Sequence, residues 1–381
     1  MLNWSVQTLF FFSLSFLAVR ADGEVNNTQA AAAKQIRAWQ DQYNNYIFEA
    51  LANRTSGCTY DKLQYRREWS SLSPKQRSAY TTAVECLQSK PNLISNIRVP
   101  GARTRFDDVV ATHIFQSPYI HFSGIFLHWH RYYTYLYDKL LRTECGYTGP
   151  QPYWDWTLTY ADPLASKIFS GTADSMGSNG IYIPNRNGTF TTAFGRLRTI
   201  PAATGGGCVT SGPFQNYTVN LGPASYEPRV GSGTGLDYNP RCLKRDVSLE
   251  FSHNLKPSDV VALIGSNAAL EAFSGFFETR EGLHASGHFT IGGDPGNDGF
   301  VSAGDPIFYL HHGQVDRLWT IWQALGGGRF GEVFGTSTAF NRPPSPNVTL
   351  DYELQYEVLS EPVTMRSVDS TIDGPFCYIY I

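Results

Sequence analysis

Apolar residues recur at helical spacing near the start of the chain. Between residues 34 and 51 they return every three to four positions, which predicts an amphipathic helix. A second helix is expected from Pro74, because Ser73 and Gln76 have the spacing of a capping box and proline suits the first helical position. That helix should run to about residue 88. The polar, alanine-rich residues 22–35 are expected to be loosely ordered.

Helical patterns return on both sides of a long irregular region. One helix is predicted from residue 104 to about 115, with His113 on its apolar stripe, and the next from about Phe126 to about Thr143. Further helices are expected near residues 257–264 and 266–277, around residues 284–288, and from residue 305 to the glycines at 326–328.

The region from residue 159 to about 248 has no continuous period and is rich in glycine and proline, which is typical of loops. We expect a long surface excursion there, with a few short strands, rather than a second domain. The tail from residue 352 is strand-like and ends in Tyr378-Ile379-Tyr380. These patterns predict a mainly α protein with long loops.

The first 21 residues have the pattern of a secretory signal peptide. An apolar run is followed by small residues at Val19 and Ala21, which predicts cleavage after Ala21 and a single domain over residues 22–381. The run is too short to span a membrane, and no other window is long and apolar enough. We therefore expect a secreted protein without a membrane anchor.

Charge and cysteine content fit this location. Loss of Arg20 leaves 29 basic and 33 acidic residues, a net charge of −4, and without a basic stripe nucleic acid is not an expected partner. Six cysteines predict three disulfides, with 15 possible pairings. Five N-x-S/T sequons in the mature chain predict N-linked glycans at Asn26, Asn53, Asn187, Asn216 and Asn347.

The main chemical signal is the grouping of histidines. Eight of the nine lie in two short windows, and the ninth, His253, stands apart in a polar stretch. The first window contains His113, His121, His128 and His130, and the second contains His284, His288, His311 and His312. Because unpaired imidazoles are costly to bury, such grouping predicts metal binding.

Spacing within the second window restricts the ligands. His284 and His288 are four residues apart and share one face of a helix. Adjacent helical residues point about 100° apart, so only one of His311 and His312 can face the same point. A zinc protease would need glutamate where Ala285 follows His284. Imidazole ligands alone suit copper, zinc, iron or nickel.

Both windows resemble the copper signatures of the tyrosinase and catechol oxidase family. The first is His121-x(4)-Phe126-Leu127-His128-Trp129-His130-Arg131, and the second is Asp305-Pro306-Ile307-Phe308-Tyr309-Leu310-His311-His312-Gly313-Gln314-Val315-Asp316. The resemblance extends in outline from about Cys58 to the end of the chain. It is strongest to the short secreted fungal members.

This resemblance implies a four-helix bundle that holds two copper ions, with phenols and O2 as substrates. Its ligands would be His113, His121 and His130 for one ion and His284, His288 and His312 for the other. The motif places the ligand at His312. His311 is then expected to support the ligands or to pack in the core, and His128 is expected to pack in the core. Asp316, one turn after His312, is expected to fix that imidazole through its second nitrogen.

The chain departs from the family pattern at three positions. Asp138 replaces a glutamate of the first signature, and Tyr119 stands where many relatives have a cysteine bonded to the second histidine, so no thioether is expected. In relatives that hydroxylate monophenols well, a glutamate and an asparagine after the first histidine of the second site hold a water. Glu281 and Glu278 are the glutamate candidates here, but the asparagine position is Ala285.

The resulting hypothesis is a catechol oxidase that converts o-diphenols to o-quinones, with weak monophenol hydroxylation. Glu281, Ala285 and Phe289, which follows His288 and can stack on a phenol, complete the predicted site. A true tyrosinase and an o-aminophenol oxidase remain alternatives, as does an oxygen carrier of the haemocyanin type. Longer family members continue past the Tyr-x-Tyr pair into a covering domain. This chain ends one residue later, so activity without proteolysis is expected.

Overall fold

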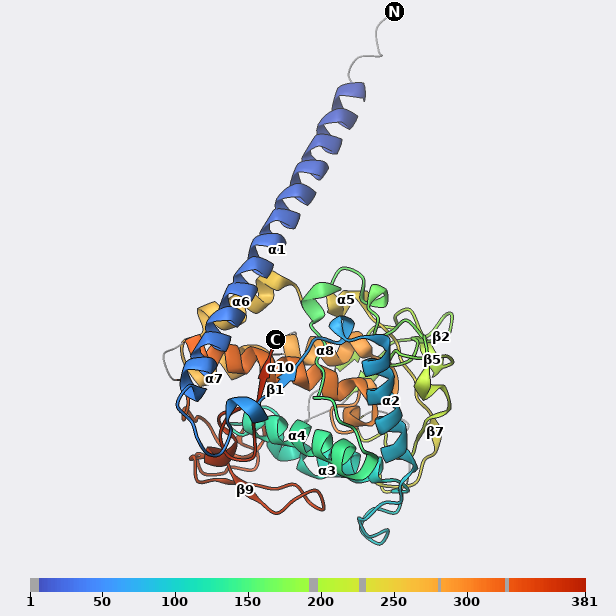
Figure 1. Cartoon of the computed structure of the whole chain (residues 1–381). Coiled ribbons are helices and arrows are strands. Elements are labelled where there is room, and N and C mark those ends of the chain that lie inside the picture. Colours follow the sequence, from blue (N-terminus) through green and yellow to red (C-terminus); the bar gives the residue numbers. More distant parts are fainter. Residues whose placement is uncertain (1–6, 192–197, 226–230, 280–281, 326–328) are drawn as a thin grey trace, which may run out of the picture.

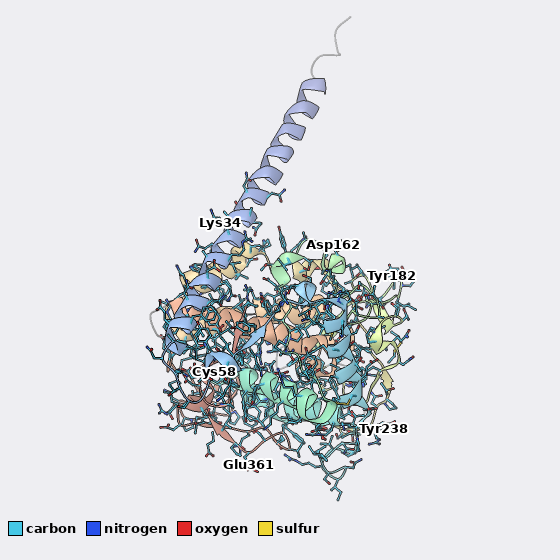
Figure 2. The ribbon with its side chains drawn as sticks, viewed as in Figure 1. Lys34, Cys58, Asp162, Tyr182, Tyr238 and Glu361 are labelled. Carbon is cyan, nitrogen blue, oxygen red and sulfur yellow. A yellow bond between two sulfur atoms is a disulfide. The ribbon has the colours of Figure 1, made fainter. Side chains whose placement is uncertain are left out.

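The computed structural model describes residues 7–191, 198–225, 231–279, 282–325 and 329–381 of the chain. A rounded, mainly helical body carries a long N-terminal helix whose first half extends away from it (Figure 1). Side chains fill the space between the ribbons of the body, and Lys34 lies near the place where that helix meets it (Figure 2). The mainly α fold expected from the sequence is confirmed.

Helix α1 spans Gln7–Leu51 as one element. Its C-terminal part packs on α6 (Pro257–Ser266) and α10 (Ile307–Leu325) and buries the predicted apolar stripe. The expectation that residues 22–35 are loosely ordered is wrong, because the helix continues through them. Four consecutive alanines at residues 30–33 are strong helix formers and extend it toward the N-terminus. No helix within the described ranges combines the length and hydropathy of a membrane span.

Helix α2 (Pro74–Ser89) begins with the predicted capping box. The Ser73 hydroxyl accepts the Gln76 amide hydrogen at 3.3 Å, and the Gln76 side chain accepts that of Ser73 at 2.9 Å. Helix α3 (Arg105–Ile120) also begins with a capping box, formed by Thr104 and Asp107. It extends five residues beyond its predicted end. Pro118 lies in its last turn, where it removes one helical N–H donor but leaves only two more residues of the helix to follow.

Most of the remaining helices were predicted, but the short helices α5 and α9 were not. Helix α4 (Phe126–Cys145) ends at Gly146, whose φ of 67° is a left-handed conformation that favours glycine. The others are α5 (Leu249–Ser252), α7 (Leu270–Glu278), α8 (Leu283–Ile291) and α9 (Gly293–Gly296). The Asp305 carboxylate accepts the Ile307 amide hydrogen at 2.9 Å and so starts α10. The predicted stop at residues 326–328 lies outside the described residues.

Helices α3, α4, α8 and α10 form the four-helix core. Helix α10 packs on both α4 and α8, and α3 packs on α4. All of α10 from Ile307 to Ala324 is buried, which makes it the central helix of the body. On α4 the predicted packing face is buried, with Trp129 stacked on Tyr133 at a ring distance of 4.5 Å. The four-helix bundle implied by the resemblance is confirmed.

Short strands occur in pairs outside this core. Four pairs are antiparallel: β2 (Gly180–Tyr182) with β5 (Gly206–Val209), β3 (Thr189–Thr191) with β4 (Arg198–Ile200), β6 (Thr218–Val219) with β7 (Arg241–Cys242), and β8 (Glu353–Leu354) with β9 (Val363–Thr364). Strand β1 (Gln64–Arg66) pairs in parallel with β10 (Tyr378–Tyr380). Single 3-10 turns span Tyr60–Lys62, Trp69–Ser71, Trp156–Leu158, Pro163–Ala165, Pro213–Asn216, Ser302–Gly304, Ala339–Asn341 and Met365–Val368.

All six cysteines form disulfides, as predicted. Cys58 pairs with Cys377, Cys86 with Cys145, and Cys208 with Cys242. The first bond lies beside the β1–β10 pair and ties the C-terminal tail to the start of the body. The second joins α2 to the end of α4, and the third joins β5 to β7 within the long excursion.

Candidate metal centre

The first three histidines come from α3, α4 and the bend between them. His113 lies within α3, His121 is the residue that caps its C-terminus, and His130 lies in the second turn of α4. The reversal between the helices includes Phe122 at a φ of 52°, a left-handed conformation that is rare for a bulky residue. This sharp bend brings His121 and His130 together, with a ring distance of 5.2 Å.

Backbone carbonyls fix the orientation of these three rings. The Nδ1 atom of His113 lies 2.8 Å from the Phe300 oxygen, and that of His130 lies 2.8 Å from the Phe126 oxygen. His121 Nδ1 lies 3.2 Å from the Ser117 oxygen. A carbonyl only accepts, so each Nδ1 carries the proton and each Nε2 presents a lone pair. These backbone oxygens could not be identified from the sequence, since every residue supplies one.

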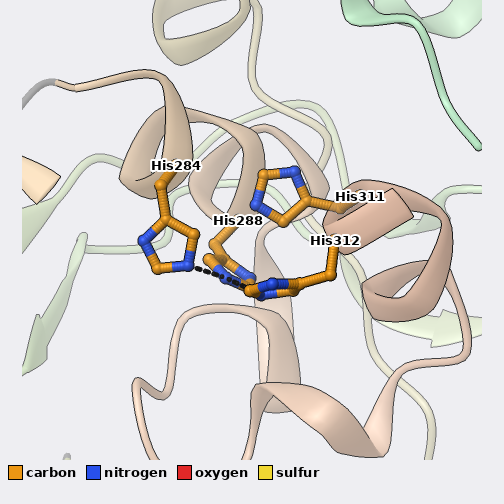
Figure 3. Close-up of side chains that lie close together, drawn as sticks. All are labelled: His284, His288, His311 and His312. Atoms are coloured by element: carbon orange, nitrogen blue, oxygen red, sulfur yellow. Dashed lines mark hydrogen bonds between the residues drawn. The ribbon is translucent and has the colours of Figure 1, made fainter. Parts of the chain in front are cut away.

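The second group comes from α8 and α10. His284 and His288 lie one turn apart on α8, and their Nε2 atoms are 3.0 Å apart. The Nε2 of His312, on α10, lies 3.3 Å from that of His288. Figure 3 shows these three side chains close together, with a dashed line leading from His284 and with His311 beside them. The structure thus brings together all six predicted ligands in two groups of three.

The spacing of these nitrogens fits a metal ion. Imidazole nitrogens bound at about 2.0–2.1 Å in tetrahedral directions lie about 3.3 Å apart, close to the distances in the second group. In the first group, the Nε2 atoms of His113 and His130 are buried and accept no hydrogen bond from any described residue. Buried polar atoms without partners are rare in folded proteins, and a cation would satisfy both. The residues present therefore fit a metal at each group.

Burial keeps these imidazoles neutral. It lowers the pKa of His113 to about 4, and it lowers the pKa of His121, His130, His284, His288 and His312 well below the ordinary range. Neighbouring imidazoles lower the pKa values of those five further. A neutral imidazole is the form that binds a metal. The two groups face each other, because the rings of His130 and His312 stack at 4.4 Å.

His311 is buried against the second group but bonds elsewhere. The indole N–H of Trp156 donates to its Nδ1 atom at 3.1 Å. The sequence identified His311 as a supporting residue but did not reveal Trp156. His128 also turns away from the site: its Nε2 lies 3.1 Å from the Asp369 carboxylate, and its ring packs on Trp319 at 4.8 Å. His253 is exposed, and no function is assigned to it.

Asp316 does not have its predicted role. Its carboxylate accepts hydrogen bonds from Arg131 at 2.6 Å and from the hydroxyls of Tyr378 and Tyr380 at 2.7 Å each. The Nδ1 of His312 has no hydrogen-bond partner within the described ranges, so no carboxylate orients this ring. Asp316 therefore bonds residues that are distant in sequence, Arg131 and the C-terminal tyrosines, and not His312.

The predicted substrate-binding residues lie at the more open side of α8. Ala285 and Phe289 are both half-buried and lie one turn apart. The guanidinium of Arg198 lies over the Phe289 ring at 4.3 Å, and Phe251 packs on the same ring at 5.1 Å. These contacts give Phe289 a packing role beside the site. Glu281 lies outside the described residues.

Glu278 is buried and forms a hydrogen bond with the backbone of the bend after α3. Its carboxylate accepts the backbone N–H of Phe122 at 2.5 Å. Burial raises the pKa of Glu278 well above its usual range. Because Phe122 directly follows His121, this contact holds the bend that carries His121. Glu278 therefore has a structural partner that the sequence did not predict.

Comparisons with known proteins agree with this geometry. The family model for the common central domain of tyrosinase matches residues 103–325. Tyrosinase P from Aspergillus terreus is 38% identical over 332 residues, covering 84% of this chain and 92% of that protein. N-acetyl-6-hydroxytryptophan oxidase from Emericella nidulans is 34% identical over 345 residues, covering 85% of this chain and 93% of that protein.

A similar fold is found among solved structures. That of a mutant polyphenol oxidase from Thermothelomyces thermophila has a TM-score of 0.85 and 39% identity, covering 91% of this chain and 98% of that chain. The domain match, the relatives of similar length and the paired histidine groups all point to one assignment. The chain belongs to the tyrosinase family, whose members are dicopper proteins.

Proposed function

We propose that this protein is a catechol oxidase that converts o-diphenols to o-quinones with O2. One copper ion would be held by His113, His121 and His130, and the other by His284, His288 and His312. The observation that carries the proposal is the pair of buried, neutral imidazole groups that face each other across the His130–His312 stack, 4.4 Å apart. When bound, the copper pair supplies the binding and reduction of O2.

The surrounding residues orient the ligands and exclude water. Carbonyl oxygens hold the Nε2 lone pairs of the first group toward the metal. Phe308 lies between the groups, stacked on His312 at 4.2 Å and edge-on to His113 at 5.1 Å. Phe126 packs against both His130 and His284. Apolar side chains of this kind exclude water from the site and so limit side reactions during oxidation.

The preference for catechols rests on the residue after His284. A catechol loses its protons readily when both oxygens approach copper, whereas a monophenol needs a base to remove its proton. The methyl group of Ala285 cannot hold a water that would serve as this base. One oxygen of the Glu278 carboxyl group already accepts the Phe122 amide hydrogen, which makes Glu278 less free to orient such a water. Both features favour oxidation of diphenols over hydroxylation of monophenols.

Ala285→Asn is expected to raise the ratio of monophenol to diphenol turnover. One hydrogen bond to a reactive water is worth about 1–3 kcal/mol, which corresponds to about 5- to 150-fold in rate. Steady-state rates on a monophenol and its matching diphenol measure the ratio. Ala285→Leu is the control, because it adds similar bulk without a polar group. Equal rates on both substrates in the unmodified enzyme would contradict the argument from Ala285.

A comparison of three substrates on the copper-loaded protein tests the proposed activity. We expect rapid oxidation of a catechol, with slow or lagging oxidation of the corresponding monophenol. Faster turnover of an o-aminophenol would favour the aminophenol oxidase alternative. A relative named for oxidation of N-acetyl-6-hydroxytryptophan shows that hydroxylated aromatic substrates vary among similar chains. Reversible oxygen binding without turnover of any phenol would instead indicate a carrier.

We further propose that the protein is secreted, with a signal peptide over residues 1–21 and a single catalytic domain over residues 22–381. Three disulfides support this location, because such bonds persist in oxidising compartments. The five sequon asparagines are all exposed, which fits glycosylation: Asn26, Asn53, Asn187, Asn216 and Asn347.

A further inference from the structure

The second histidine group contains one imidazole more than a three-ligand site requires. His284, His288, His311 and His312 all place a ring nitrogen within 4.8 Å of one another (Figure 3). His311 and His312 are neighbours on α10, and both rings are fully buried. Something other than distance must therefore decide which of the two binds copper. The inference below rests on the proposed ligand set.

Trp156 supplies that distinction through one hydrogen bond. Its indole nitrogen carries a proton and can only donate, so the His311 Nδ1 atom, 3.1 Å away, must be the acceptor. A neutral imidazole has one lone pair and one N–H. Its proton is therefore on Nε2, a buried atom that has no hydrogen-bond partner among the described residues. The Trp156 indole thus selects the tautomer of His311 that carries its proton on Nε2.

The position of the His311 ring depends on Gly287. A methyl group at Gly287 would lie 2.1 Å from Cε1 and 2.4 Å from Nδ1 of His311. The ring therefore lies directly on the backbone of α8, between the turns that carry His284 and His288. It is edge-on to His288 at 4.4 Å and stacked on His284 at 5.6 Å. Only glycine leaves room for this contact.

Trp156 is itself fixed to α10. The neighbouring Trp154 amide donates to the Leu310 oxygen at 3.0 Å. The Asp155 carboxylate accepts from Gln314 at 3.1 Å and pairs with Arg317 at 3.2 Å. These contacts on both sides of His311 hold the indole over its Nδ1 atom.

We propose that Trp156 sets the ligand register of the second copper site. By donating to His311 Nδ1, it occupies the lone pair of His311 and leaves that of His312 for the metal. Trp156 and His311 are thus positioning residues. His311, packed on Gly287, also maintains the spacing of His284 and His288.

Measuring which tautomer His311 adopts tests the proposal directly. Nitrogen-15 NMR of histidine-labelled protein assigns the proton to Nδ1 or Nε2, and both the metal-free and the diamagnetic copper(I) forms are suitable. We expect Nε2–H for His311 in both. A proton on Nδ1 in the unmodified protein would overturn the proposal. Because the metal-free form is included, this result does not depend on whether copper binds as proposed.

Trp156→Phe tests the consequence, with Trp154→Phe as matched control. Each change removes an indole N–H from a buried ring, but the N–H of Trp154 has no partner among the described residues. We expect Trp156→Phe to give mixed His311 tautomers, two copper(II) signals by electron paramagnetic resonance in half-loaded protein, and about 10- to 100-fold weaker binding of one copper ion. Trp154→Phe should retain one tautomer and one signal.

An unchanged tautomer and copper signal in Trp156→Phe would overturn the proposal while leaving the dicopper assignment intact. Gly287→Ala provides a second route, because its methyl group must displace the His311 ring. We expect it to disturb the same copper ion and to leave the ion bound by the first group unchanged. Retention of the unmodified copper signal in Gly287→Ala would count against the positioning role of His311.

Discussion

His312→Ala is expected to remove one of two copper ions and to lower catechol oxidation by more than about 100-fold. Loss of a supporting partner alone costs about 10- to 100-fold in metal affinity or activity, so loss of a ligand should cost more. Copper content per chain and steady-state turnover measure the effect. The same result is expected for alanine at the other proposed ligands, His113, His121, His130, His284 and His288.

Two other histidines provide controls for this series. His253 is exposed and belongs to neither histidine group, so His253→Ala should retain both copper ions and nearly full activity. His311→Ala should be intermediate, because it removes a positioning residue and leaves the ligands in place. If His312→Ala retains both ions while His311→Ala loses one, the ligand register is displaced by one residue.

Asp316→Asn should destabilise the protein by about 3–5 kcal/mol, the usual cost of removing one partner from a buried ion pair. Asp316 is 4% exposed, and its carboxylate accepts hydrogen bonds from Arg131, Tyr378 and Tyr380 and lies 3.7 Å from Arg66. Its loss leaves two buried guanidinium groups without their shared charge. It also loosens the contact between α10, α4 and the C-terminal strand β10.

Urea unfolding of the metal-free protein measures this change without a contribution from bound copper. Asp351→Asn is the control, because the ion pair of Asp351 with Arg366 is exposed and should contribute less than about 1 kcal/mol. Equal stability losses in the two variants would show that the Asp316 cluster does not hold the tail to the bundle.

The sequence predicted most of the helices because their starts are encoded locally. Ser73 with Gln76 and Asp305 with Pro306 are chemical signals within a few residues of each other, and the structure places helices after both. The N-terminal extension of α1 was missed, because the polar residues around the alanines at 30–33 were interpreted as a loosely ordered segment. The end of α3 was missed because Pro118 is tolerated so close to a helix terminus.

The histidine groups were predictable for a similar reason, since spacing and flanking residues mark them. The residues that orient them were not. His113 is fixed by the carbonyl of Phe300, and His311 by the indole of Trp156, both more than a hundred positions away. For Asp316 the local pattern was misleading. It lies one turn from His312 on the same helix, but its carboxylate bonds Arg131 and the C-terminal tyrosines instead.

Copper content of the purified protein, measured together with catechol oxidation, tests the central claim most directly. Two buried histidine groups, each with three proposed ligands, predict two copper ions per chain. Activity should disappear when a chelator removes copper and should return in proportion to copper added back. One copper ion per chain, or bound zinc without oxidase activity after copper loading, would contradict the dicopper assignment.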